Sequence, residues 1–170
     1  MEQTQGAAVR DPGTGRSLAR RSVALGAAGG MRSFTPLAAV VSTYDDAPAD
    51  HGWRRWPVLR SPWGRRLIIG MAAAELVGDK MPAIPSRLSP PALLGRVAAS
   101  ALAGAALGAV APRAGAARSA ALAAAAALAG ALGGSWCRGA IVEAAGVPDA
   151  AVALLEDSAA IALSRGAARG

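Results

Sequence analysis

Residues 119–137, SAALAAAAALAGALGGSWC, run for nineteen positions without a charged side chain. A helix needs about 20 predominantly apolar residues to cross the hydrocarbon core of a bilayer. Alanine is only marginally apolar, but the absence of any charge over this length outweighs its weak hydropathy. The segment therefore predicts a helix that crosses a membrane.

The rest of the chain shares this composition. Of its 170 residues, 46 are alanine and 21 are glycine, while 53% are hydrophobic and only 4% are aromatic. An ordinary soluble core is filled by larger aliphatic and aromatic side chains, and a disordered chain is polar and rich in charge. Since neither description fits, we expect one small membrane domain whose helices pack closely through alanine and glycine.

The basic residues are distributed as they are in membrane proteins. The formal net charge is +7, and 17 of the 18 basic residues are arginine, concentrated in residues 1–21 and 44–66 beside apolar segments. Basic flanks of apolar segments set membrane orientation and attract anionic headgroups. The pattern favours membrane topology over nucleic-acid binding, so we expect membrane lipid and no nucleic acid among the partners.

Proline, glycine and charge divide the chain into five helical segments, at 22–43, 67–81, 92–111, 119–137 and 150–164. We interpret residues 1–21 as a disordered basic tail, residues 22–165 as the membrane domain and residues 166–170 as a C-terminal tail. The predicted fold class is all-α, an integral membrane helical bundle of four or five short Gly/Ala-rich helices.

The first segment contains the sequence Gly-Gly-Met-Arg-Ser-Phe-Thr-Pro (29–36). Pro36 removes a backbone donor and disfavours helical geometry at Thr35, so the helix should kink or break there. If all five segments cross the membrane, the arginines divide almost evenly between its two sides. If this segment is broken or re-entrant, the tail, the 44–66 loop, the basic 112–118 turn and the C-terminus share one side. Both arrangements stay open.

Three pairs of glycines lie four residues apart, about one helical turn, at Gly26/Gly30, Gly104/Gly108 and Gly130/Gly134. Such a pair leaves a flat strip on the helix surface, where the backbone of a neighbouring helix can approach closely. Together with the low aromatic content, the pairs predict tight helix packing inside the membrane.

Charges within the apolar segments define a candidate polar centre. A charge at the bilayer midplane costs about 2.5–3.5 kcal/mol on insertion scales, so it should face the bundle interior and find a partner. Arg96 is one such charge, near the start of its segment. The candidate residues of the centre are Arg32, Glu75, Asp79, Arg138, Glu156 and Asp157. They form either a polar pathway for a proton or ion, or buried ion pairs that only fix helix packing.

No pattern indicates an enzyme. The chain has one cysteine, Cys137, and one histidine, His51, too few for a disulfide, a cysteine-based zinc site or a histidine-carboxylate metal site. No serine or cysteine lies in a histidine and acid pattern, and no phosphate-binding glycine loop is present. We therefore expect no catalytic residues, no metal and no cofactor.

Several short motifs resemble a family of small bacterial multi-pass membrane proteins, domain of unknown function 4126. They are Gly-Gly-Met-Arg-Ser-Phe-Thr-Pro (29–36), Ser-Pro-Trp (61–63), Ala-Glu-Leu-Val-Gly-Asp-Lys-Met-Pro (74–82), Pro-Ser-Arg (85–87), Val-Pro-Asp (147–149) and Leu-Leu-Glu-Asp (154–157). The resemblance covers roughly residues 22–165. It implies a multi-pass location in the cell membrane and no established activity, so it supplies no site residues.

Two functions stay open at this point. The first is a small transporter- or channel-like protein with a buried polar centre. The alternative is a non-transporting membrane scaffold or assembly partner, in which the charges only fix packing. A homo-oligomer or a membrane protein partner is compatible with either.

Overall fold

The computed structural model describes residues 12–78, 89–110 and 114–169, and these residues form helices and connecting turns without a strand. The predicted all-α class is confirmed. The helices are α1 (Pro12–Met31), α2 (Thr35–Ser42), the 3-10 helix η1 (Gly52–Arg55), α3 (Pro57–Arg60), α4 (Pro62–Gly78), α5 (Pro90–Gly108), α6 (Ala114–Ala145) and α7 (Asp149–Arg169).

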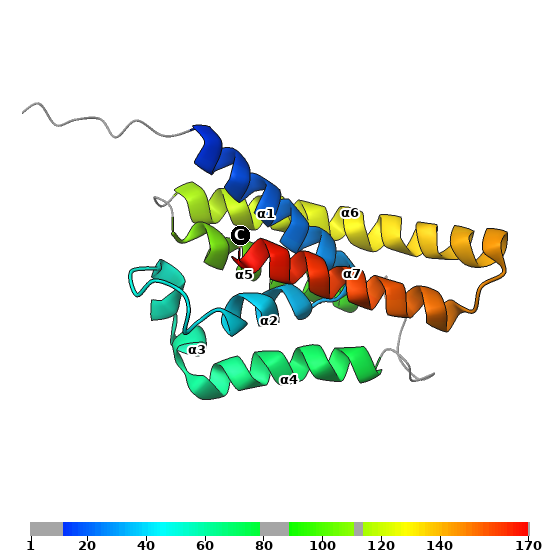
Figure 1. Ribbon diagram of the computed structural model, residues 1–170, viewed down its shortest axis with the longest axis horizontal. Coiled ribbons are helices and arrows are strands. Elements are labelled where there is room, and N and C mark those ends of the chain that lie inside the picture. The colour runs from blue at the N-terminus through cyan, green and yellow to red at the C-terminus, as the bar shows by residue number, and fades with distance from the viewer. Residues whose placement is uncertain (1–11, 79–88, 111–113, 170) are drawn as a thin grey trace, which may run out of the picture.

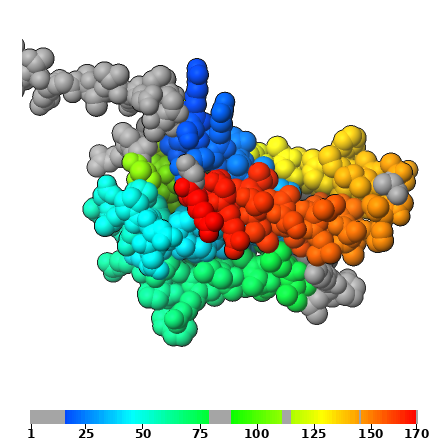
Figure 2. Space-filling view, viewed as in Figure 1, coloured from blue at the N-terminus to red at the C-terminus, as the bar shows by residue number. Residues whose placement is uncertain are grey.

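The helices pack around α1 and α6. Both α1 and α5 lie along α6, while α7 packs on α1 and α2. The outermost helix is α4, which packs on α2 and α3 (Figure 1). The end of α6 and the start of α7 project together beyond the other helices, as the space-filling view shows (Figure 2).

The close approach of α1 and α5 to α6 depends on glycine. A Cβ atom on Gly26 of α1 would lie 2.2 Å from the carbonyl oxygen of Ala123, and one on Gly104 of α5 would lie 2.4 Å from that of Ser119. Because real Cβ atoms do not come so near a backbone oxygen, any side chain here would push the helices apart. Gly30 and Gly108 make equally close approaches to α6.

The third glycine pair behaves differently. Gly130 packs on Ala27 of α1, but a Cβ on Gly134 would meet nothing within 4 Å. The packing predicted from glycine spacing is therefore confirmed for two pairs and for half of the third. Ala131 is still buried against Gly30 of α1, and the last part of α6 extends past the other helices beside the start of α7 (Figure 1).

The N-terminal and C-terminal boundaries predicted from the sequence are wrong. Residues 12–21 are not a disordered tail but the first turns of α1, and residues 166–169 continue α7. Arg21 explains part of this difference, because its guanidinium donates hydrogen bonds to the carbonyl oxygens of Ala167 and Ala168 at 2.8 and 3.2 Å. These carbonyls belong to the last turn of α7, which has no helical partner for them.

The expectation of four or five short helices is also wrong. The helix built around residues 119–137 has 32 residues, because it begins at Ala114, inside the stretch expected to be a turn, and continues to Ala145. The helices α2, α3, α4 and α5 each have a proline in their first turn. Pro36 thus lies at the expected break of the first segment and at the start of α2. Proline suits that position because its missing N–H would have no helical partner there.

The chain reverses direction after α1, and α2 runs back along the molecule (Figure 1). The start of α1, the loop after α2, the end of α5 and the end of α7 consequently meet at one end, where they line a common hollow. The first half of α1, residues 52–66, the start of α6 and the last turns of α7 lie toward this end, which we call the basic end because these segments carry most of the described arginines. This is the arrangement expected for a broken first segment.

By length and composition alone, two helices of the described chain could cross a membrane, α5 and residues 115–144 of α6. Only 17% of the apolar window in α6 is buried inside the protein, against 44% in α5. Large apolar side chains are correspondingly exposed on these helices, including Leu94, Leu102, Leu128, Leu132 and Trp136. Exposed apolar surface on this scale indicates contact with lipid or with another protein.

Gly104→Ala tests the packing directly. The added methyl group meets α6, so we expect the free energy of unfolding to fall by about 1–3 kcal/mol, measured by thermal unfolding of the purified protein. Gly95→Ala is the control on the same helix, because a Cβ there meets nothing within 4 Å. That change should raise stability by about 0.5–1 kcal/mol. Equal effects of both changes would contradict the packing argument.

Candidate functional site

A break in the first segment forms the centre of the candidate site. The helix α1 ends at Met31 and α2 begins at Thr35, so residues 32–34 are not helical. Arg32 is 1% exposed and Thr35 is 8% exposed, which places the break inside the bundle. The last carbonyls of α1 and the first amides of α2 lack helical partners and need others.

Arg96 binds the carbonyl end of the break. Its Nη1 atom donates hydrogen bonds to the carbonyl oxygens of Gly30 and Met31, at 3.0 and 2.8 Å. The side chain comes from α5 and is almost completely buried. A cation at the C-terminus of a helix also interacts favourably with the helix dipole. Arg96 therefore completes the hydrogen bonding of α1 from outside that helix.

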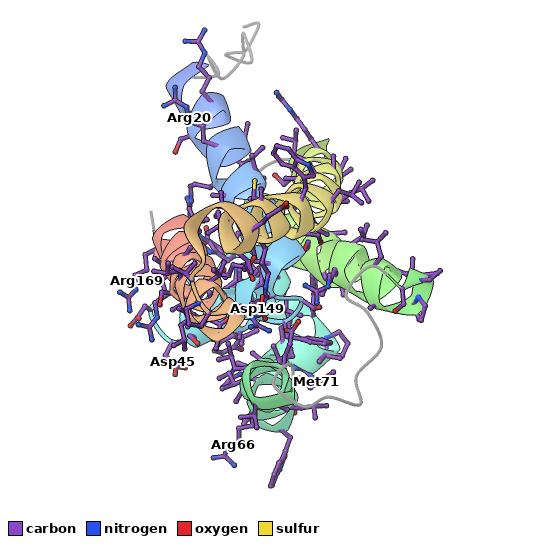
Figure 3. The ribbon with its side chains drawn as sticks, turned by 90° about the vertical axis from the view of Figure 1, so that its right-hand side faces the viewer. Arg20, Asp45, Arg66, Met71, Asp149 and Arg169 are labelled. Atoms are coloured by element: carbon purple, nitrogen blue, oxygen red, sulfur yellow. The ribbon has the colours of Figure 1, made fainter. Side chains whose placement is uncertain are left out.

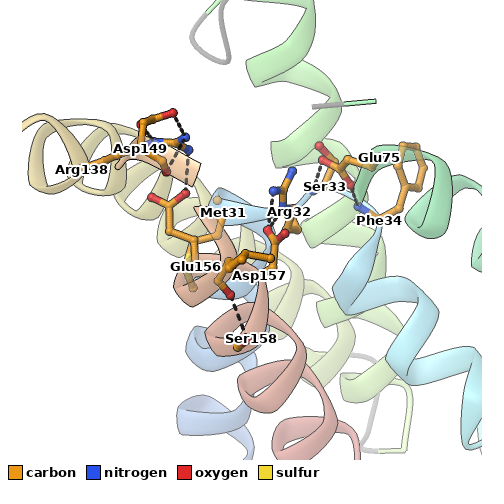
Figure 4. Close-up of polar contacts among 12 residues, drawn as sticks. Met31, Arg32, Ser33, Phe34, Glu75, Arg138, Asp149, Glu156, Asp157 and Ser158 are labelled. Atoms are coloured by element: carbon orange, nitrogen blue, oxygen red, sulfur yellow. Dashed lines mark hydrogen bonds and ion pairs between the residues drawn. The ribbon is translucent and has the colours of Figure 1, made fainter. Parts of the chain in front are cut away.

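Glu75 of α4 binds the amide end of the break (Figure 4). Its carboxylate accepts hydrogen bonds from the backbone amides of Ser33 and Phe34, at 2.7 and 3.0 Å. An anion at this position matches the partial positive charge at the start of α2. The Glu75 carboxylate also lies 3.9 Å from the guanidinium of Arg96, so the two groups that close the break form an ion pair.

Arg32 lies within the break and reaches α7. Its Nε atom donates a hydrogen bond of 2.5 Å to the carboxylate of Asp157, and its Nη2 atom contacts the same oxygen. Both side chains are buried. The pair attaches the non-helical residues to the middle of α7.

A second group of charges lies between α6 and α7. Arg138 binds the carboxylate of Asp149 through Nε at 2.6 Å, and that of Glu156 through Nη1 at 3.1 Å. Asp149 is the first residue of α7, and its carboxylate also accepts a hydrogen bond from Nη2 of Arg138 at 2.5 Å. These pairs hold the projecting ends of α6 and α7 together across their turn.

Two hollows lie between the helices. The first, of about 510 Å³, lies between α1, α6 and α7 and is lined by Met31, at the end of α1, and by Glu156 among others. The second, of about 290 Å³, lies between α2, α4 and α7 and is lined by Thr35, at the start of α2, and by Ile161 among others. Each hollow therefore touches one end of the helix break, while Arg32 and Asp157 line neither of them.

The residues predicted from the sequence fall into two groups. Arg32, Glu75 and Asp157 meet at the helix break, and Arg138 and Glu156 meet in the group between α6 and α7. Asp79 lies outside the described residues. The sequence marked Arg96 as a charge in an apolar helix, but nothing in it indicated that Arg96 and Glu75 bind backbone atoms 65 and 42 residues away.

Within residues 12–78, 89–110 and 114–169, no three histidine, cysteine or carboxylate side chains lie together as metal ligands. The side chain of Cys137 is exposed. The charges of the site are bound instead to one another and to the backbone.

Asp157→Asn tests the buried pair. The change leaves the Arg32 guanidinium buried opposite a neutral amide, and loss of one partner of a buried pair costs about 3–5 kcal/mol. We expect this fall in the free energy of unfolding, while Asp45→Asn, at an exposed position, changes it by about 0.5 kcal/mol or less. The double change Arg32→Met with Asp157→Leu should be less destabilising than Asp157→Asn, because it leaves no charge behind. If Asp157→Asn lowers the free energy of unfolding less than the double change does, the assignment of Arg32 and Asp157 as a buried ion pair is contradicted.

Comparison with known proteins found no match: no family model, no curated protein sequence and no solved structure matches this chain.

Proposed function

We propose that this protein is an integral protein of the cell membrane that crosses it several times. Support comes from the two long apolar helices and from the apolar side chains that α4, α5, α6 and α7 expose. We further propose that the helix break is the polar centre of a transporter- or channel-like pathway for a proton or ion. Membership of the domain of unknown function 4126 family is part of this proposal and rests on the motifs in residues 29–36 and 74–82.

One observation carries the functional part. The break between α1 and α2 lies inside the bundle, its backbone ends are bound by Glu75 and Arg96, and a buried ion pair attaches it to α7. Non-helical backbone at membrane depth is tolerated only where protein or a water-filled cavity surrounds it. Transporters place ion and substrate sites at the ends of such discontinuous helices.

The alternative is a scaffold without transport activity, and one observation favours it. Arg32, Arg138 and Glu75 all have strong partners in the closed arrangement that the structure shows. Buried ion pairs of this kind fix helix register without conducting anything. The exposed apolar faces would then bind a second copy of this chain or another membrane protein.

Flux measurements distinguish the two functions. We expect proteoliposomes with the wild-type protein to pass protons, or one of potassium, sodium and chloride, faster than empty liposomes. Glu75→Gln should reduce this flux, because a neutral amide offers only one acceptor oxygen to the two amides of the break. Asp45→Asn, at the basic end, serves as the matched control and should conduct like the wild type.

Flux no faster than that of empty liposomes for every ion tested would rule out the transport function and leave the scaffold. A protein that stays in solution without detergent would overturn the membrane proposal itself.

Cysteine accessibility tests the topology. In a Cys137→Ser background, single cysteines at Ser17, Asp50 and Arg169 should be labelled from the same side of the membrane, and one at Val147 from the other. The positive-inside rule makes the first side cytoplasmic. Labelling of Asp50→Cys and Ser17→Cys from opposite sides would contradict the reversal of the chain at the helix break.

A further inference from the structure

The hollow between α2, α4 and α7 has apolar walls. Alanine, leucine and isoleucine side chains from all three helices line it, and its volume is about 290 Å³. The lining residues used below are Ala39 of α2, Ala73 and Leu76 of α4, and Ile161 of α7. Such walls suit an aliphatic chain better than a hydrated ion.

One wall of this hollow carries a polar group that lacks a partner. Ser164 of α7 is completely buried, and its Oγ atom makes no hydrogen bond to any described residue. A buried hydroxyl without a partner costs about 1–3 kcal/mol. The hydroxyl is out of reach of water in this structure, so an oxygen atom of an occupant would remove this cost only after the side chains that cover Ser164 move aside.

The same hollow opens at the basic end of the molecule. Arg165 and Arg169 line it there and are exposed, and neither forms an ion pair with a described residue. Asp46 lies at the same opening, so the three groups have a net charge of +1. Asp45 lies on the same side of the molecule as Arg169 (Figure 3) but does not line the hollow. The opening therefore favours a negatively charged group.

We propose that this hollow binds one anionic phospholipid. Arginine recognises phosphate through paired hydrogen bonds, which assigns the phosphate to Arg165 and Arg169. The Ser164 hydroxyl, one residue away on α7, donates to an ester oxygen, and an acyl chain lies against Ala73 and Leu76. Basic pockets between membrane helices on the cytoplasmic side bind headgroups in this way. The proposal rests on the membrane location proposed above and not on transport.

A lipid bound here has a structural consequence. The helix α4 packs chiefly on α2 and α3, and the hollow separates it from α7. An acyl chain in the hollow joins α4 to α7 and so supports the position of Glu75 at the helix break. Occupancy should therefore raise the thermal stability of the whole protein.

The test compares lipids that differ only in their headgroup. Phosphatidylglycerol or phosphatidylcholine with identical acyl chains is added to the protein in neutral detergent, and Tm and bound lipid are measured by thermal unfolding and native mass spectrometry. At a hundredfold excess over Kd, we expect phosphatidylglycerol to raise Tm by about 5 °C or more, with one lipid retained. Equal shifts with both lipids would overturn the proposal.

Paired variants locate the site. Arg165→Gln with Arg169→Gln should abolish the shift caused by phosphatidylglycerol. Arg55→Gln with Arg60→Gln removes the same charge from exposed positions at the same end, outside the hollow, and should preserve it. Equal losses in the two pairs would indicate attraction to the basic surface in general and would overturn the assignment to this hollow.

Two further changes probe the interior without removing charge. Ser164→Ala should leave Tm without lipid unchanged or higher, because it removes an unpartnered hydroxyl, and should reduce the lipid-induced shift. Ala73→Leu fills the hollow and should also reduce the shift, whereas Ala74→Leu, the neighbouring position outside the hollow, should not. Full shifts in both Ser164→Ala and Ala73→Leu would overturn the site.

A last arm separates the phospholipid from a free fatty acid, whose carboxylate has similar chemistry. In this arm, oleate and phosphatidylcholine are added together in place of phosphatidylglycerol. A rise in Tm with oleate, in the absence of phosphatidylglycerol, would overturn the phospholipid assignment. If no lipid-induced rise in Tm is found, the transport proposal still stands on the flux measurement. If no flux is found, the lipid proposal still stands on the rise in Tm. The two proposals therefore fail separately.

Discussion

The fold depends on how the ends of α1 and α2 are satisfied where the first segment breaks. In the interior of a bundle, burying unpaired N–H and C=O groups at two helix ends would destabilise the fold by several times the cost of one lost hydrogen bond. Glu75 and Arg96 remove that cost from two other helices, α4 and α5. Because both must lie at the break, their positions fix where the chain reverses. The reversal in turn brings the loop after α2 to the basic end.

Small side chains and charged side chains contribute different things to this arrangement. Gly26 and Gly104 let α1 and α5 approach α6 closely, but such contacts tolerate sliding along the helix axis. Charged contacts do not, since Arg96 reaches two particular carbonyls and Arg32 one particular carboxylate. The glycines therefore set the distance between helices, and the charges set their register.

Features with a local cause could be predicted from the sequence, and features with a distant cause could not. Pro36 predicts the break because it restricts its own neighbours, and the spacing of Gly26 and Gly30 predicts a flat helix face. The helical start of α1 depends on Arg21 binding α7, at the other end of the chain. Likewise, Glu75 pairs with a charge, Arg96, as expected, but it also binds the backbone amides of Ser33 and Phe34, whose position beside α4 the sequence does not reveal.

The geometry of the centre also bears on how an ion would pass. Asp157 is bound by Arg32, and the Glu75 carboxylate is occupied by two amides and by Arg96 at 3.9 Å. Either carboxylate could bind a cation only after the present partner of that carboxylate moved away. This separation costs free energy each time an ion passes, unless the cation takes the place of the partner. A continuous open pore does not fit such a centre. A pathway through it would work by exchange of partners, one ion for each rearrangement, with α4 as the long helix least held by its neighbours.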